Sequence, residues 1–267
     1  MTVVHQPQLP PSLHRHISGT YEDFEPIQIG MSGAQTYRLL DHAGNVCYLK
    51  IGPPTGIVGL RDEMQRLQWL AGRLPVPELL AYTEEEGQGY LLTSGLIGEN
   101  VADLVAQPNT DRARWVTLLA QALRQFHAQP WQDCPFDHRF AAMSEMARRH
   151  TQLGLVDENE FDDIRQGRRS AELLDELAQL APESEELCLT HGDYCLPNII
   201  VDSDSVTGFV DLGRMGVGDR YRDLALARRS LDYNGCTDLI PLFFQTYGLP
   251  TPDDQKLHLY QLIDEFF

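Results

Sequence analysis

The 267-residue sequence predicts an α+β fold in two lobes, a small antiparallel β-sheet lobe with one helix followed by a larger, mostly helical lobe. Two observations favour this fold. The first third of the chain alternates short β-type runs with turns, whereas the remainder carries long apolar stripes at helical spacing. The length and a hydrophobic share of 42% suffice for one two-lobed domain, or two modest ones, with a substantial core.

The small lobe opens with three β-type runs separated by turns, at residues 24–30, 35–40 and 46–51. Their short connections predict an antiparallel meander. After a loop rich in proline and glycine, residues 60–72 repeat apolar side chains at helical spacing, and Gly72 is a plausible end of that helix. We therefore expect one helix packed on a small sheet.

Composition shifts at Ser94 and Gly95, where a predicted strand breaks and long helical patterns begin. We place the boundary there, with one lobe at 1–96 and the other at 97–267. In the larger lobe, apolar stripes predict helices around 115–126 and 173–180 and from about Tyr221 to the end. Three short runs predict strands, at 187–191, 198–201 and 206–212.

The chain holds 39 acidic and 21 basic residues, a formal net charge of -18. Such a charge repels nucleic-acid phosphates and anionic lipid headgroups and attracts cationic ligands. We therefore expect neither a nucleic-acid nor a membrane partner. An acidic composition also serves solubility alone, so the charge is informative only beside a site.

Five cysteines stand far apart and form no Cys-x-x-Cys pair, which favours neither a disulfide framework nor a zinc cluster. The first residues lack a basic segment followed by an apolar core, and nowhere do about 18 apolar residues run together. We expect a cytoplasmic protein in a reducing compartment, present as a monomer or weak dimer.

Three oxygen-bearing side chains adjoin the short strands of the larger lobe: Asp193, Asn198 and Asp211. The strand order should bring them to one end of a hairpin. Mg²⁺ takes carboxylate and amide oxygens and completes its shell with water and substrate phosphate. A carboxylate outside that shell can orient and deprotonate an alcohol that attacks a phosphoryl group. These residues predict a magnesium site for phosphoryl transfer.

The runs THGDYCLPNI, GFVDLGRMGVGDRYRDLALA and the terminal YQLIDEFF resemble the aminoglycoside 3'-phosphotransferases that act on kanamycin and neomycin. The similarity covers essentially the whole chain, more weakly before Lys50 and in the middle of the helical lobe. It implies a protein-kinase-like fold and ATP-dependent phosphorylation of an aminoglycoside 3'-hydroxyl, which inactivates the antibiotic.

The resemblance gives each oxygen-bearing residue a role. Asp193 is implied to be the catalytic carboxylate that faces the substrate hydroxyl, while Asn198 and Asp211 bind the Mg²⁺ ions that bridge the ATP phosphates. Lys50 reaches the α- and β-phosphates, and Glu63 holds it extended. A histidine in the same loop, His191, is expected to brace the loop by hydrogen bonding rather than to transfer protons.

Further nucleotide contacts are implied along the small lobe. Ser32, in the turn GMSGA, would cover the phosphates, although the turn alone would be an ordinary hairpin. Backbone groups of a hinge would meet the adenine edge; these belong to Ser94, Gly95 and Leu96. Tyr48 could stack on the adenine ring, and strand packing explains it nearly as well.

On the substrate side, the acidic loop VDENEFDD and the chain end offer carboxylates to a polyamine. The resemblance assigns the aminoglycoside pocket to seven residues: Glu160, Asp162, Arg214, Arg229, Asp264, Glu265 and Phe267. The arginines should orient acidic neighbours and substrate hydroxyls. Without the resemblance, a solvated acidic face would explain the loop. Ser230 and Tyr233 stand where some family members carry acidic residues.

Three other functions remain open from the residues. The same fold could phosphorylate another small alcohol, such as homoserine, choline or a sugar. A non-catalytic nucleotide-binding protein would usually lack one of the lysine, aspartate or asparagine positions, and all are present. A metal-dependent hydrolase would need a second histidine motif at metal spacing, which the sequence lacks.

Overall fold

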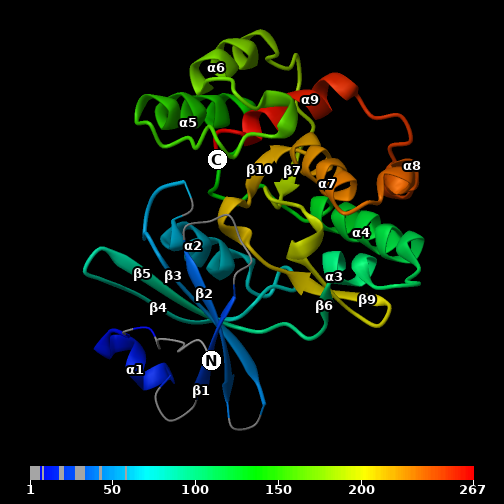
Figure 1. Cartoon of the computed structure of the whole chain (residues 1–267). Coiled ribbons are helices and arrows are strands. Elements are labelled where there is room, and N and C mark those ends of the chain that lie inside the picture. The colour runs from blue at the N-terminus through cyan, green and yellow to red at the C-terminus, as the bar shows by residue number, and fades with distance from the viewer. Residues whose placement is uncertain (1–6, 8, 18–20, 28–33, 42–43, 58) are drawn as a thin grey trace. The chain divides into compact units, whose positions relative to one another are not determined.

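The computed structural model describes residues 7, 9–17, 21–27, 34–41, 44–57 and 59–267. The chain divides into two compact units (Figure 1). The first consists of Met1–Gly98 with Thr207–Arg214, and the second of Glu99–Val206 with Met215–Phe267. The later segment that contains Asp211 thus belongs to the first unit. Ser32, predicted to cover phosphates, lies outside the described residues.

The first unit contains a five-stranded sheet in the order β1-β2-β3-β5-β4, with every neighbouring pair antiparallel. Its strands are β1 (Tyr21–Ile27), β2 (Gln35–Asp41), β3 (Val46–Gly52), β4 (Leu79–Glu85) and β5 (Gln88–Ser94). The first three form the predicted meander. Because β3 is flanked by β2 and β5, the central strand is the one that carries Lys50.

The two faces of β3 have different surroundings. Cys47 and Leu49 are buried in a hydrophobic cluster that includes Leu13 and Ile17 of the short helix α1 (Pro11–Ile17). The sequence interpretation did not anticipate α1. Since successive side chains of a strand point to opposite faces, Lys50 lies on the face away from this cluster.

Helix α2 (Leu60–Leu70) confirms the helix predicted at 60–72 and ends two residues early. No side chain caps its start; instead, the backbone N–H groups of Leu60 and Arg61 donate to the carbonyls of Pro53 and Pro54. These bonds satisfy two of the N–H groups that a helix leaves unpaired. Gly72 follows with a φ of +75°, the left-handed conformation that favours glycine after a helix.

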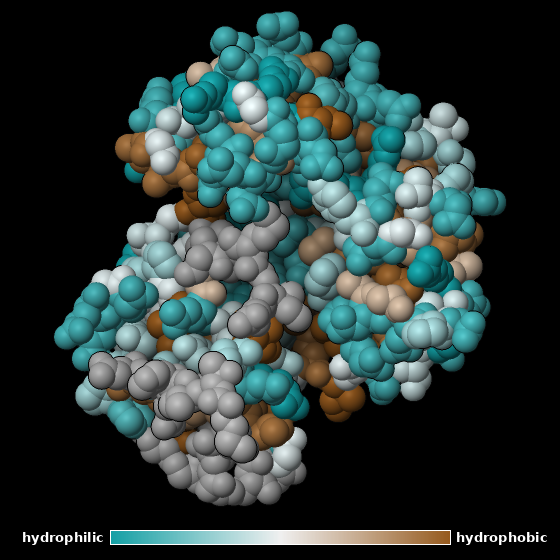
Figure 2. Space-filling view, viewed as in Figure 1, coloured by the Kyte–Doolittle hydropathy of each residue, from teal (hydrophilic) through white to brown (hydrophobic). Residues whose placement is uncertain are grey.

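The second unit is mostly helical. Its helices are α3 (Val101–Ala106), α4 (Arg112–His127), α5 (Phe140–Gln152), α6 (Ser170–Gln179), α7 (Tyr221–Tyr233), α8 (Ile240–Tyr247) and α9 (Asp254–Asp264). Helices α5, α6 and α9 pack together, with the C-terminus beside α5 (Figure 1). In the view of Figure 2, hydrophilic residues cover most of the surface over α6. No helix within the described ranges is long and apolar enough to cross a membrane.

The remaining described strands are short. They are β6 (Glu99–Asn100), β7 (Leu187–Thr190), β8 (Ile199–Asp202), β9 (Ser205–Phe209) and β10 (Gly216–Asp219). Of these, β9 runs from the second unit into the segment that belongs to the first. Strand β7 pairs antiparallel with β10, and β6 with β8. The predicted strands at 187–191, 198–201 and 206–212 are confirmed with shifted ends. Strand β10 was not predicted, because its glycine-rich sequence carries little β propensity.

Replacing Leu49 by alanine should destabilise the protein by about 2–5 kcal/mol, because the side chain is fully buried and a cavity would remain. Urea unfolding monitored by circular dichroism measures this change. Leu153→Ala is the matched control, since that side chain is 60% exposed and its loss should change stability by less than about 0.5 kcal/mol. Equal stability of the two variants would contradict the assigned core.

Candidate active site

A lysine with two carboxylates forms the charged centre of the first unit. Lys50 Nζ donates to both carboxylate oxygens of Glu63 on α2, at 2.7 and 2.9 Å, and also to Asp211 Oδ1. The ion pair expected between Lys50 and Glu63 is therefore present. Asp211 adopts a φ of +57°, which is uncommon for a residue other than glycine. Its side chain remains half exposed.

Burial and charge act in opposite directions on this group. Burial favours the neutral form of Lys50, but Glu63 and then Asp211 outweigh burial and raise the pKa of the ammonium. Burial raises the pKa of Glu63, and the Lys50 charge opposes that rise. The lysine is thus held as a cation between two carboxylates, those of Glu63 and Asp211, in the form suited to binding phosphate.

The predicted hinge donates its backbone N–H groups largely to the protein itself. Ser94 N donates to Glu78 O at 2.9 Å, and Gly95 N donates to Val46 O at 2.7 Å. A side chain at Gly95 would place a Cβ atom 2.9 Å from Val46 O, so the close approach requires glycine. The N–H groups of Ser94 and Gly95 are therefore already hydrogen-bonded within the protein. Of the three predicted hinge residues, Leu96 is the one whose N–H is left for the adenine edge.

Tyr48 lies on the same face of β3 as Lys50, two residues away, and is partly exposed. It is therefore outside the hydrophobic cluster formed by Cys47 and Leu49 on the other face. This placement is compatible with the predicted stacking on adenine, which stays a prediction.

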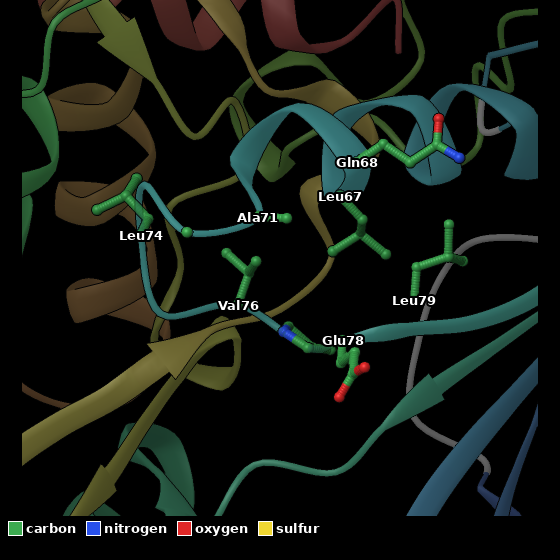
Figure 3. A pocket seen from close by; sticks show the side chains of 9 residues that line it. Leu67, Gln68, Ala71, Leu74, Val76, Glu78 and Leu79 are labelled. Carbon is green, nitrogen blue, oxygen red and sulfur yellow. The ribbon is translucent and has the colours of Figure 1, made fainter.

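A cavity of about 410 Å³ adjoins the end of α2 (Figure 3). Leu67, Gln68 and Ala71 of α2 line it together with residues on the way into β4, including Leu74, Val76 and Leu79. Most of its lining is apolar. None of the predicted nucleotide contacts lines this cavity, so it is distinct from the predicted ATP site.

In the second unit, the loop after β7 brings Asp193 and Asn198 together. The Asn198 side-chain N–H₂ donates to the backbone carbonyl of Asp193 and to its Oδ2, each at 2.9 Å. Both bonds use the amide nitrogen, so the amide oxygen of Asn198 keeps its lone pairs for another partner. Asp193 is partly exposed, whereas Asn198 is buried.

A buried aspartate, Asp223 on α7, fixes this loop. Its carboxylate accepts the backbone N–H groups of His191 at 2.7 Å and Gly192 at 2.8 Å. Burial acts to raise the pKa of Asp223, but the hydrogen bond and charge of His127 outweigh it, and the pKa is lowered. Asp223 was not singled out from the sequence; an acid within the apolar run DLALA was the available signal.

The bonds around Asp223 continue to α8. His127 Nε2 lies 3.0 Å from Asp223 Oδ2, and His127 Nδ1 lies 2.8 Å from the Tyr247 hydroxyl. The brace expected of His191 is also observed, since His191 Nδ1 accepts the backbone N–H of Asp193 at 3.3 Å. The loop is thus held on both sides of Gly192, whose φ is +86°.

Two of the predicted substrate carboxylates share one arginine. Arg229 on α7 donates to Asp264 Oδ2 at 2.5 Å and to Asp162 Oδ2 at 3.3 Å. Burial acts against the charge of Arg229, but Asp264 and Asp162 outweigh burial and raise the pKa of the guanidinium. Tyr233 also donates to Asp162, at 3.1 Å. The structure therefore brings three predicted pocket residues together.

Glu265 makes its described hydrogen bonds to the protein. It accepts the backbone N–H of Asp162 at 3.1 Å and Arg165 Nη1 at 2.9 Å, and its side chain is only 3% exposed. Burial, followed by the charge of Asp162, raises the pKa of Glu265 to about 7. Arg165, which is 2% exposed, was not predicted. Glu265 therefore positions the loop that carries Asp162.

The remaining predicted substrate residues have different settings. Glu160 is exposed, and its carboxylate makes no hydrogen bond to the described residues. The ring of Phe267 lies edge-on to His150, with centroids 5.2 Å apart, and His150 Nδ1 lies 2.8 Å from Phe266 O. Arg214 ends a 3₁₀ turn (Leu212–Arg214) that belongs to the first unit.

Two features are typical of a kinase-like phosphotransferase. One is an antiparallel sheet unit with a Lys50–Glu63 ion pair, and the other is a helical unit with an Asp193–Asn198 loop. The chain belongs to the phosphotransferase enzyme family (APH), whose sequence pattern it matches over residues 23–260. This membership confirms the predicted resemblance and the predicted enzyme class.

Within that family, curated aminoglycoside 3'-phosphotransferases are among its relatives. One from Niallia circulans is 37% identical over 245 residues, covering 90% of this chain and 91% of its own. One from Streptomyces fradiae is 35% identical over 259 residues, covering 92% and 96%.

A solved aminoglycoside-3'-phosphotransferase of type VIII superposes with a TM-score of 0.84, at 32% identity, covering 96% of this chain and 97% of its own. The predicted fold is therefore confirmed. The aminoglycoside phosphotransferase APH(3'')-Id from Streptomyces rimosus, solved with ADP and streptomycin, has a TM-score of 0.74 at 29% identity, covering 91% and 92%.

Glu265→Gln should flatten the dependence of stability on pH. Between the ordinary pKa of 4.5 and about 7, folded Glu265 holds more protons than the unfolded chain, so its contribution to stability falls as pH rises. Glutamine does not titrate. Urea unfolding at about pH 5 and about pH 8 should show a larger loss in the wild type than in the variant.

The matched control is Glu160→Gln, which removes an exposed carboxylate from the loop that Glu265 positions and should keep the wild-type dependence. Parallel curves for Glu265→Gln and the wild type would show that Glu265 ionises normally.

Proposed function

We propose that this protein transfers the γ-phosphoryl group of ATP to the 3'-hydroxyl of kanamycin- and neomycin-type aminoglycosides and so inactivates them. The observation that carries the proposal is the Asp193–Asn198 pair on a loop anchored by a buried carboxylate. The aminoglycoside 3'-phosphotransferases of similar sequence, alignable over about nine-tenths of each chain, support the choice of substrate.

Asp193 is proposed to accept the proton of the substrate hydroxyl as it attacks the phosphoryl group. Three features support this role: its side chain is partly exposed, Asn198 holds one carboxylate oxygen, and His191 holds its backbone N–H. Fixing the carboxylate in this way lowers the entropy lost when it meets the hydroxyl.

Lys50 is proposed to bind the α- and β-phosphates of ATP, with Glu63 holding its side chain extended. The pKa of Lys50 is raised, so the ammonium is charged at any pH where the enzyme would work. Tyr48, on the same face, would stack on the adenine, and Leu96 would offer its backbone. ADP in the structure of the Streptomyces rimosus enzyme supports nucleotide binding by such a fold.

Mg²⁺ is the proposed metal, and the available donors suit it. Asn198 keeps an amide oxygen unused by its described bonds, and Asp211 presents a half-exposed carboxylate. Both are hard oxygen ligands, and a Mg²⁺ ion normally completes its shell with water and phosphate oxygens. Bound there, the metal would neutralise charge on the phosphates.

The aminoglycoside ammonium groups are proposed to meet the carboxylates of Glu160, Asp162 and Asp264, with Phe267 lining the same pocket. Arg229 would keep Asp162 and Asp264 fixed rather than bind substrate ammonium itself, since its guanidinium already bonds both acids. Glu265 would contribute through the loop that it holds. Arg214 is proposed to orient substrate hydroxyls.

In this proposal, residues 1–96 form the nucleotide-binding lobe and 97–267 the catalytic and aminoglycoside-binding lobe, with Asp211 contributed to the nucleotide side. We further propose a cytoplasmic location, where ATP is available and cysteines stay reduced. A monomer or weak dimer is proposed as the working form.

Purified protein with ATP, Mg²⁺ and kanamycin should release ADP and form a singly phosphorylated product, because the proposed chemistry transfers one phosphoryl group. A 3'-deoxy aminoglycoside should bind without turnover. Coupled ADP release and mass spectrometry measure both. If homoserine, choline or a sugar is phosphorylated and kanamycin, neomycin and ribostamycin are not, the substrate is another small alcohol and the aminoglycoside proposal is wrong.

Asp193→Ala should lower kcat by about 10²–10⁴-fold with little change in KM for either substrate, as expected when a positioned base is lost. Steady-state kinetics measure the change, and circular dichroism checks the fold. Asp238→Ala, an exposed aspartate of the same unit, should keep wild-type kinetics. Near-normal turnover in Asp193→Ala would exclude the assigned role.

A further inference from the structure

A second cavity, of about 350 Å³, lies in the second unit away from the residues assigned above. The end of α4, the start of β7, the start of α7 and the end of α8 form its walls; Figure 1 shows α8 beside α4. None of Asp193, Asn198, Glu160, Asp162 or Asp264 lines it. Its size is within the range of small-molecule sites.

The lining of this cavity combines two arginines, one glutamate and some apolar surface. Arg124 is exposed and, within the part of the chain that the structure describes, has no acidic partner. Arg220 pairs with Glu186 at 2.8 Å, yet its Nε is buried and has no acceptor among the described residues. Leu187 and Ala128 add apolar surface. Two guanidiniums therefore line one cavity, with Glu186 as the acidic residue among the lining.

Two further lining residues belong to the bonds that hold the catalytic loop. Tyr247 contacts His127, His127 contacts Asp223, and Asp223 accepts the N–H groups of the loop. Arg220 immediately precedes α7 and accepts the N–H of Leu224, so it lies one turn before Asp223. An occupant of the cavity would therefore contact the support of Asp193 without contacting Asp193.

We propose that this cavity binds a small aromatic carboxylate and that the bound anion slows phosphoryl transfer through the His127–Asp223 support. The carboxylate accepts from Arg124 and Arg220, because planar guanidiniums recognise carboxylates with paired hydrogen bonds. The ring lies against Leu187 and Ala128. A purely inorganic anion would leave that apolar surface unused.

The expected effect follows from competition for Arg220. A bound carboxylate draws this guanidinium from Glu186 and Tyr247 and so alters the first turn of α7 and the Tyr247–His127 contact. The loop is shifted from its active arrangement to the extent that the anion prefers the altered state. The substrates' own contacts are untouched, so kcat falls while KM for both substrates stays the same.

Benzoate is the test probe, and benzamidine is the control that keeps the ring and reverses the charge. Isothermal titration with the full-length protein should show one benzoate site, and benzamidine should not displace benzoate from it. Arg124→Gln should weaken benzoate binding by about tenfold or more, the loss expected for a charge-assisted hydrogen bond, with basal kcat unchanged. Arg149→Gln removes an exposed arginine of α5 and should bind benzoate as the wild type does.

Kinetics complete the test. Saturating benzoate should lower kcat in the wild type and in Arg149→Gln, with KM for ATP and aminoglycoside constant, and should lose this effect at the same concentration in Arg124→Gln. Three results would each overturn the proposal: no benzoate binding, equal benzoate affinity in the wild type and Arg124→Gln, or benzoate binding that leaves kcat unchanged. The titration needs no turnover, so failure of the aminoglycoside assignment is distinguished from failure of this site.

Discussion

The conformation of the loop that carries Asp193 depends on its hydrogen bonds to the carboxylate of Asp223. This carboxylate is fully buried and accepts the N–H groups of His191 and Gly192. A buried charge is costly unless hydrogen-bonded, and here the contacts from His127 and the loop lower its pKa and keep it ionised. Because two successive backbone donors share this one acid, the conformation of Gly192 and the position of Asp193 follow from it.

Elsewhere, buried or partly buried cations hold the carboxylates in place. Lys50 holds Glu63 and Asp211, Arg229 holds Asp162 and Asp264, and Arg165 holds Glu265. In a chain of 39 acidic and 21 basic residues, each of these three cations pairs with two acids. Each cation offsets the repulsion between its acidic neighbours, so carboxylates can be gathered in an already acidic protein.

Local patterns predicted much of this arrangement, because they depend on neighbours in sequence. The period of two in β3 places Lys50 and Tyr48 on one face, and the helical spacing of α2 places Glu63 on its buried side. The helix α1 was missed, since seven residues with two prolines before them carry little helical signal. Arg165 and Asp223 were missed because the partners that explain their burial lie up to 100 residues away.

The sequence alone determined the chemistry: which acids, amides and cations exist, in which order along strands and helices, and hence the family. Only the tertiary structure decided which carboxylates are used internally. Glu160 and Glu265 are the same residue type near equally acidic neighbours, yet Glu160 is exposed, while Glu265 is enclosed by Arg165 and the N–H of Asp162. Burial and long-range hydrogen bonding cause this difference between the two glutamates, and the spacing of residues along the sequence predicts neither of them.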